Sequence, residues 1–114
     1  MLKPNVLRKK KDFSMLYSRG KSVGDKYVVL FYKKNGLTYN RVAFLASKKV
    51  GNSVFRNRAR RLMKESFREL EKEFRTGYDL IIIGRNTING IKCQEVFKSL
   101  KSASNRGKLL ETSK

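Results

Sequence analysis

The chain has 114 residues, and 28 Lys or Arg against 9 Asp or Glu give it a formal net charge of +19. It has no histidine and one cysteine, Cys93, which excludes an internal disulfide and leaves the zinc-site patterns without ligands. No apolar run is long enough to span a bilayer, and the first residues lack the apolar stretch of a secretory signal. We therefore expect a single cytoplasmic domain over residues 1–114, frayed at about residues 1–6 and 102–114, with an anionic partner.

The first predicted element is a short helix that begins near Asp12. Phe13, Leu16 and Tyr17 follow with the i, i+3, i+4 spacing of one helix face. Gly20 is expected to end it, because glycine is the usual residue just past a helix C-terminus.

Two β-rich runs follow, at residues 27–32 and 41–46, and a turn signal at residues 33–36 lies between them. This spacing predicts a hairpin. A nearly continuous apolar run at residues 78–83 predicts a central strand that is covered on at least one face. A shorter helix at about residues 92–101 is expected last, and its buried face is Val96, Phe97 and Leu100.

The main helix is predicted from about residue 53 to residue 74, and Gly77 stops it. At about 100° per residue its apolar side chains fall on one side. The expected buried residues are Phe55, Ala59, Leu62, Met63, Ser66, Phe67, Leu70 and Phe74. The element order is thus a helix, two or three strands, the long helix, a strand and a helix, which is an α+β fold. We expect a small mixed four-stranded sheet packed with helices in the order α-β-β-β-α-β-α.

Positive charge is concentrated on this helix. Residues 26–64 contain no Asp or Glu, and Arg56, Arg60, Lys64 and Arg68 form an i, i+4 row away from the apolar stripe. An ordinary solvated helix face mixes charges of both signs, because like charges at i, i+4 are destabilising. Arginine is the residue that grips phosphate with a planar fork. The pattern therefore favours a nucleic-acid backbone, with a further phosphate on the free N–H groups at the helix start, after residues 51–53.

Residues 47–61 read SKKVGNSVFRNRARR. This stretch closely resembles the signature of the bacterial ribonuclease P protein component, whose hallmark is an Arg-Asn-Arg triplet that opens a basic helix. The resemblance extends over about residues 7–101, through the first helix and the apolar strand at residues 78–83. It implies a left-handed strand–helix–strand crossover, an exception to the usual right-handed rule.

The resemblance also implies a function. Members of that family bind a large catalytic RNA, which with its magnesium ions cuts the 5′ leader from precursor tRNA. We therefore expect no catalytic residue, no cofactor or metal bound by the protein itself, no small-molecule substrate, and two partners, the catalytic RNA and the leader-bearing precursor tRNA.

The implied RNA-binding residues lie on the basic helix and at its start. Leader recognition is expected to rest on stacking by Phe13, Tyr17 and Phe31, because unpaired bases stack on aromatic rings. Arg56, Asn57 and Arg60 are expected to reach over that cleft, and Lys48, Lys49, Arg58, Arg61 and Lys64 to contact the catalytic RNA. The full set of basic-helix residues is Lys48, Lys49, Asn52, Ser53, Arg56, Asn57, Arg58, Arg60, Arg61, Lys64 and Arg68.

Other functions explain the sequence less well. A ribosomal or other structural RNA-binding protein shares the charge and the small size, but it predicts no aromatic cleft for a single strand. A DNA-binding helix-turn-helix fits poorly, because the basic helix follows a strand. A free-standing nuclease needs a histidine base or clustered carboxylates, whereas Asp12, Asp25 and Asp79 belong to separate predicted elements.

Overall fold

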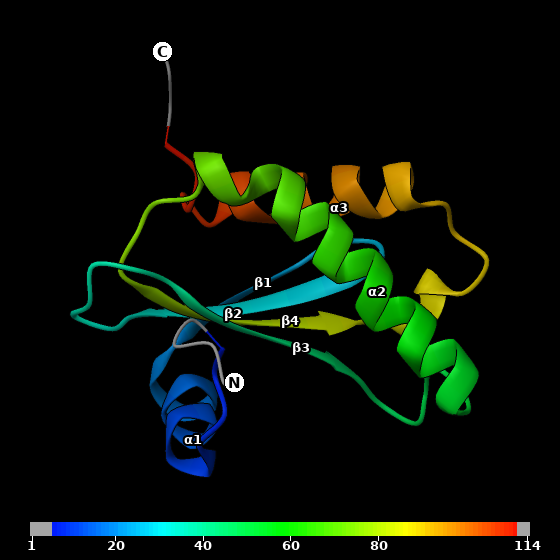
Figure 1. Cartoon of the computed structure of the whole chain (residues 1–114), viewed down its shortest axis with the longest axis horizontal. Helices are drawn as coiled ribbons and strands as arrows, with labels where there is room; N and C mark the ends of the chain where they lie inside the picture. Colours follow the sequence, from blue (N-terminus) through cyan, green and yellow to red (C-terminus); the bar gives the residue numbers. More distant parts are fainter. Residues whose placement is uncertain (1–5, 112–114) are drawn as a thin grey trace.

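The computed structural model describes residues 6–111. Four strands form one sheet in the order β1-β2-β4-β3, in which β3 is parallel to β4 and the other pairs are antiparallel. Figure 1 shows α2 and α3 on one face of this sheet and α1 on the other. The mixed four-stranded α+β fold is therefore confirmed. The elements are α1 (Lys10–Arg19), β1 (Lys21–Gly24), β2 (Val28–Lys34), β3 (Arg41–Ala46), α2 (Ser53–Leu70), β4 (Tyr78–Gly84) and α3 (Cys93–Arg106), with short 3-10 turns at Glu71–Glu73 and Asn86–Ile88.

The predicted hairpin between residues 27–32 and 41–46 is wrong. β2 and β3 are not neighbours, because β4 lies between them and pairs with both. β4 is the most apolar strand. Its side chains are removed from water on both faces of the sheet only if it takes a central position. β3, α2 and β4 consequently form a strand–helix–strand crossover, the connection for which the resemblance implies a left hand.

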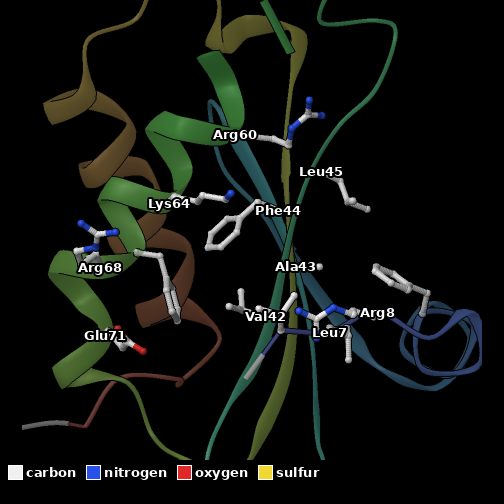
Figure 2. A pocket seen from close by; sticks show the side chains of 13 residues that line it. Leu7, Arg8, Val42, Ala43, Phe44, Leu45, Arg60, Lys64, Arg68 and Glu71 are labelled. Carbon is white, nitrogen blue, oxygen red and sulfur yellow. The ribbon is translucent and has the colours of Figure 1, made fainter. Parts of the chain in front are cut away.

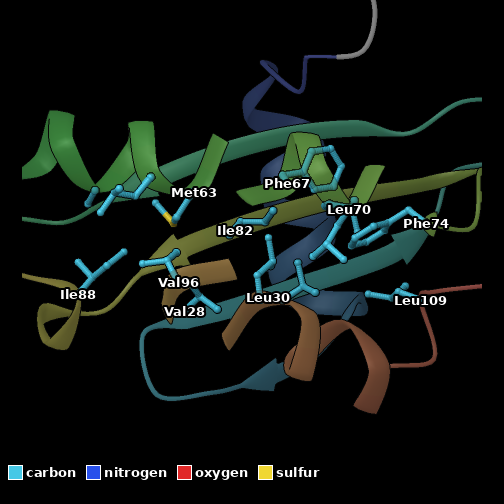
Figure 3. Close-up of a cluster of buried hydrophobic side chains, with 14 of the residues drawn as sticks. Val28, Leu30, Met63, Phe67, Leu70, Phe74, Ile82, Ile88, Val96 and Leu109 are labelled. Atoms are coloured by element: carbon cyan, nitrogen blue, oxygen red, sulfur yellow. The ribbon is translucent and has the colours of Figure 1, made fainter. Parts of the chain in front are cut away.

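Side chains of β4 alternate between two cores. Leu80 and Ile82 belong to the larger cluster with α2 and α3, part of which is drawn in Figure 3, and Ile81 belongs to a smaller cluster that includes Leu16 of α1. All three β4 residues are 0% exposed. The period-2 alternation of a strand explains this division. Both helical layers are thereby fixed to the same strand.

The buried face of α2 is confirmed except at its first turn. Ala59, Leu62, Met63, Ser66, Phe67 and Leu70 are buried, and Phe74 is buried beyond the helix end. Phe55, however, is 47% exposed. Its ring covers Gly51 instead, where a Cβ atom would lie only 3.0 Å from the ring. The helical period assigned Phe55 to the core, but the first turn packs against its own loop.

The C-terminal segment also differs from the prediction. α3 continues to Arg106, and Leu109 and Leu110 are buried beyond it. Leu110 forms an antiparallel bridge with Phe74, so this segment packs against the larger core beside the end of α2. The predicted fraying is therefore wrong for residues 102–111, while residues 1–5 and 112–114 lie outside the described residues.

A polar contact fixes α3 to the β1–β2 turn. The Asp25 carboxylate accepts hydrogen bonds from the Lys26 N–H at 2.8 Å, Ser99 Oγ at 2.8 Å and Arg106 Nη2 at 2.5 Å. Burial by itself would raise the pKa of Asp25, but these hydrogen bonds and one from Ser102 outweigh it and lower the pKa. The charged carboxylate is therefore part of the folded structure.

We expect Asp25→Asn to lower the free energy of unfolding by about 1–3 kcal/mol near neutral pH, the usual effect of losing a hydrogen-bonded charge. The folded pKa lies below the ordinary value of 3.8. Asp25 therefore contributes fully to the free energy of unfolding above pH 3.8, and this contribution is lost as the pH falls through the lower, folded-state pKa. Asp25→Asn should lack this pH-dependent loss of stability. Urea denaturation at about pH 7 and about pH 3 measures both effects.

Glu95→Gln is the control for this experiment, because Glu95 forms an exposed ion pair with Lys98, with side chains 51% and 73% exposed. Such pairs contribute about 0–1 kcal/mol. Equal losses for both variants would show that Asp25 does not anchor α3.

Candidate nucleic-acid interface

A cleft of about 720 Å³ runs along β3, one of the two edge strands of the sheet. Residues 42–45 of β3 form its floor, α2 forms one wall, and the segment before α1, together with Phe13, forms the other (Figure 2). Val6 bridges Val42, and the Leu7 N–H donates to the Val42 carbonyl at 3.1 Å. The start of the described chain is thereby fixed against the floor. We call this hollow the β3 cleft.

Cations line both walls of the β3 cleft. Arg60, Lys64 and Arg68 project from successive turns of α2, and Arg8 lies on the opposite side (Figure 2). Glu71, at one end, is the acidic member of the lining. Field lines from several like charges reinforce each other in a cleft, so the site favours an anion.

The structure therefore moves Lys64 from one expected group to the other. The roles implied by the resemblance grouped it with Arg61 on the surface for the catalytic RNA, but it lies in the cleft lining beside Arg60 and Arg68, its neighbours in the i, i+4 row. Arg56, one turn earlier, is half-buried and lies outside the lining, and its Nε is buried without a partner within residues 6–111. Asn57 is exposed and accepts a hydrogen bond from Arg60, which holds that guanidinium near the cleft.

The start of α2 is capped by its own sequence. Asn52 Oδ1 accepts hydrogen bonds from the N–H groups of Val54 at 3.1 Å and Phe55 at 3.3 Å. These are groups that the sequence analysis left free for a phosphate, so that prediction is wrong at these two positions. Asn52 and Ser53 remain exposed beside the cationic surface.

Two kinds of cation surround this helix start. Lys48, Lys49 and Arg61 are exposed, as RNA-binding side chains must be. Arg58 is half-buried, and its Nη2 donates to the Ile91 carbonyl at 2.7 Å. Arg58 therefore ties α2 to the loop before α3, a structural role that its spacing alone did not distinguish from RNA binding.

The three aromatic residues expected in the leader site are divided. Phe13 is half-buried and lines the β3 cleft. Tyr17 and Phe31 lie outside that lining and pack edge to face, with ring centres 5.0 Å apart at 80°. Tyr17 is 47% exposed, whereas Phe31 packs against the smaller core. Phe13 and Phe31 thus contribute to the core while keeping part of each ring exposed.

Among the lining residues that sequence reasoning did not assign to the site, Arg8 and Phe44 offer a charge and a ring to a ligand. Phe44 lies on β3 and contacts Phe67 of α2, with ring centres 5.9 Å apart. Arg8 enters the site because the segment before α1 runs beside β3. The signal that could have found both is the edge position of β3, which the hairpin prediction concealed.

The carboxylates of Asp12 and Asp79, assigned to separate elements, meet at one guanidinium. Arg41 donates to Asp79 Oδ1 at 2.8 Å and Oδ2 at 2.7 Å, and its Nη1 lies 3.5 Å from Asp12 Oδ2. The hydrogen-bonded Asp79 raises the pKa of Arg41 above its usual value. This contact joins α1 to β3 and β4 and so fixes one wall of the cleft.

Residues 6–111 contain neither a metal-ligand cluster nor a membrane-spanning helix. No three His, Cys, Asp or Glu residues within residues 6–111 gather closely enough to hold a metal ion. Over the same residues, no helix is both long and apolar enough to cross a bilayer.

Comparison with known proteins identifies the family. The ribonuclease P family profile matches residues 1–108. The ribonuclease P protein component of Clostridium botulinum (strain 657 / Type Ba4) is 45% identical over 103 residues, which span 90% of this chain and 89% of the relative. That of Thermoanaerobacter sp. (strain X514) is 49% identical over 82 residues, 72% of this chain and 71% of the relative. This chain belongs to the ribonuclease P protein family.

Solved structures of ribonuclease P proteins have the same fold. The Staphylococcus aureus protein matches with a TM-score of 0.85 at 26% identity, covering 96% of this chain and all of that protein (100%). The Thermotoga maritima protein matches with a TM-score of 0.81 at 28% identity, over 89% of this chain and 96% of the other. The ribonuclease P protein component is part of an endoribonuclease ribonucleoprotein, and the elements that build the β3 cleft lie within residues 1–108, which the family profile matches.

We expect Asn52→Ala to lower the free energy of unfolding by about 1 kcal/mol, because α2 loses its side-chain cap. Thermal and urea denaturation measure this change, and Ser53→Ala, one residue later, is the matched control with a smaller expected effect. Unchanged stability together with weaker RNA binding would show that Asn52 contacts RNA rather than capping α2.

Proposed function

We propose that this chain is the protein subunit of ribonuclease P, which binds the catalytic RNA with one surface and the 5′ leader of precursor tRNA with another, in the cytoplasm. The observation that carries the proposal is the β3 cleft, which combines cationic walls with aromatic rings. Family membership supplies the ribonucleoprotein context. The two surfaces are separate parts of the proposal.

The β3 cleft suits an unpaired strand. Single-stranded RNA is held by a basic groove that follows its phosphates and by rings on which its bases stack. Arg60, Lys64 and Arg68 supply the first feature, and Phe13 and Phe44 supply the second. Tyr17, packed on Phe31, offers a further exposed ring on the α1 face of the sheet, where the leader can continue.

The catalytic RNA is proposed to contact the outer surface at the start of α2. Lys48, Lys49 and Arg61 are exposed there, and within residues 6–111 none of them forms an ion pair with a carboxylate. Arg58 is proposed to support this surface indirectly, by holding Ile91. We propose that the RNA also supplies the magnesium ions for hydrolysis.

A structural RNA-binding protein, such as a ribosomal one, is the alternative. It accounts for the cationic outer surface, but it gives no reason for a cleft of about 720 Å³ lined by Phe13 and Phe44. The joining of Asp12 and Asp79 does not favour a free-standing nuclease, because both carboxylates are engaged by Arg41.

We expect Lys64→Ala to weaken binding of leader-bearing precursor tRNA to the reconstituted complex about tenfold, since a hydrogen bond to a charged group contributes about 1.5 kcal/mol. Binding of mature tRNA, which lacks the leader, should change less than about twofold. Titration of both tRNAs measures this difference. For the precursor, the slope of log K against log salt concentration should become less negative by about 0.7, as expected for the loss of one contact with a single-strand phosphate.

Arg61→Ala is the matched control, because Arg61 is exposed on the same helix but outside the cleft. It should weaken assembly with the catalytic RNA without discriminating between the two tRNAs, and protein free of RNA should cleave neither. Equal losses of precursor and mature tRNA for Lys64→Ala would contradict the leader assignment.

A further inference from the structure

A second basic hollow lies on the β1–β2 half of the sheet and shares no lining residue with the β3 cleft. Its volume is about 380 Å³, and it forms where α1 runs into β1, β2 ends, β4 begins and the chain leaves α3. We call it the tyrosine pocket, after Tyr32 and Tyr78 in its lining. Neither the expected leader site nor the expected surface for the catalytic RNA includes it.

The charge of the tyrosine pocket has one sign. Its lining contains five cations and no acidic residue, and within residues 6–111 none of these cations forms an ion pair with a carboxylate. Mutual repulsion of cations around so small a hollow opposes folding unless an anion is bound. The five residues are Arg19, Lys21, Lys33, Lys34 and Lys108.

The two tyrosine rings add a second recognition feature. Their centres are 6.5 Å apart at 61°, and both rings are half-buried against the larger core. No hydrogen bond from either hydroxyl to another group is present in the described part of the chain, so both remain able to bond a ligand. A pair of packed tyrosine rings with free hydroxyls suits a nucleobase or a ribose more than an isolated inorganic ion.

The surrounding backbone is fitted closely to Tyr32. A Cβ atom on Gly107 would lie 3.2 Å from the Tyr32 ring, and one on Gly20 would lie 2.9 Å from the Tyr32 carbonyl oxygen. Lys108 follows with φ +58°, in the left-handed region that non-glycine residues seldom adopt. The turn at Gly20 thus packs on the Tyr32 backbone and the turn at Gly107 packs on the Tyr32 ring, and the second turn places Lys108 in the lining.

We propose that the tyrosine pocket binds one nucleotide of single-stranded RNA, with its phosphate on the lysine side chains and its base or ribose on Tyr32 and Tyr78. RNA combines the two chemical features that the pocket offers, a phosphate and a flat ring. The inference rests on the proposed function for the identity of the partner, but it assigns a contact apart from the leader and the α2 surface. The chain then touches RNA on both halves of its sheet.

The test is titration of the isotope-labelled full-length chain with a single-stranded RNA of about five nucleotides, followed by NMR. We expect RNA to move the amide signals of Gly107 and Lys108 and the ring signals of Tyr32 and Tyr78. Inorganic pyrophosphate and a peptide of glutamates are the comparison ligands, and they should bind the pocket at least about tenfold more weakly. An equal response to either ligand would overturn the inference, since no base would then be recognised.

Paired variants separate this site from the β3 cleft. Lys21→Ala with Lys34→Ala should weaken RNA binding at the pocket signals about tenfold and leave the cleft signals of Phe44 and Lys64 unchanged. The control, Lys72→Ala with Lys98→Ala, removes the same charge from exposed positions outside both linings. It should change both affinities less than about twofold.

The outcomes distinguish the two proposals. Pocket signals that move while the cleft signals stay still would support this inference and contradict the leader assignment. Cleft signals that saturate while Gly107, Lys108 and both tyrosines stay still would overturn this inference and leave the proposed function intact. An equal loss for the variant and the control pair would also overturn it, because only total charge would then matter.

Discussion

The position of β4 between β2 and β3 decides which surfaces of the sheet stay open. Leu80, Ile81 and Ile82 are 0% exposed, so this strand requires cover on both faces and takes a central place. β3 is consequently left at the edge, with its outer side toward the cleft. The crossover from β3 to β4 then carries α2, with Arg60 and Lys64, alongside that edge.

Packing explains how α2 tolerates its charge. Each like-charge pair at i, i+4 costs about 0.2–0.5 kcal/mol, whereas each fully buried large apolar side chain contributes about 1.5–3 kcal/mol. Met63 and Leu70 are 0% exposed and Phe67 is 5% exposed, so the buried face outweighs the repulsion on the other side. The Asn52 cap stabilises the first turn further. The cations can therefore remain available to phosphates without unfolding the helix.

Local patterns predicted the elements well and their partners less well. The 3.6-residue period of α2 identified its core residues because they all face one sheet, and it erred only at Phe55, whose neighbour is a loop. The turn signal at residues 33–36 correctly predicted that the chain reverses direction after β2. The strand that pairs with β2, however, is β4, more than forty residues further along the chain. Leu109 and Leu110 lie in a short polar tail without helical or strand periodicity, so no pattern in the sequence predicted that they are buried or that Leu110 pairs with Phe74.

The site was predictable in composition but not in arrangement. The acid-free segment and the Arg-Asn-Arg triplet located the cationic helix, and the family resemblance supplied the function. Spacing placed Lys64 in one row with Arg60 and Arg68, but it could not show that this row borders β3 or that Arg58 bonds the Ile91 carbonyl, because both depend on what packs beside the helix. Arg8 enters the cleft for a similar reason, through the bridge of Val6 to Val42.

Site-specific photo-crosslinking tests the central claim that the leader lies on β3 between α1 and α2. A photoreactive phenylalanine analogue in place of Leu45, on the cleft floor, would be irradiated in the reconstituted complex with precursor tRNA, with the same analogue at the exposed Lys98 as control. We expect crosslinks from position 45 to leader nucleotides and few from position 98. Crosslinks from position 45 to the catalytic RNA or to the mature tRNA body, with none to the leader, would contradict it.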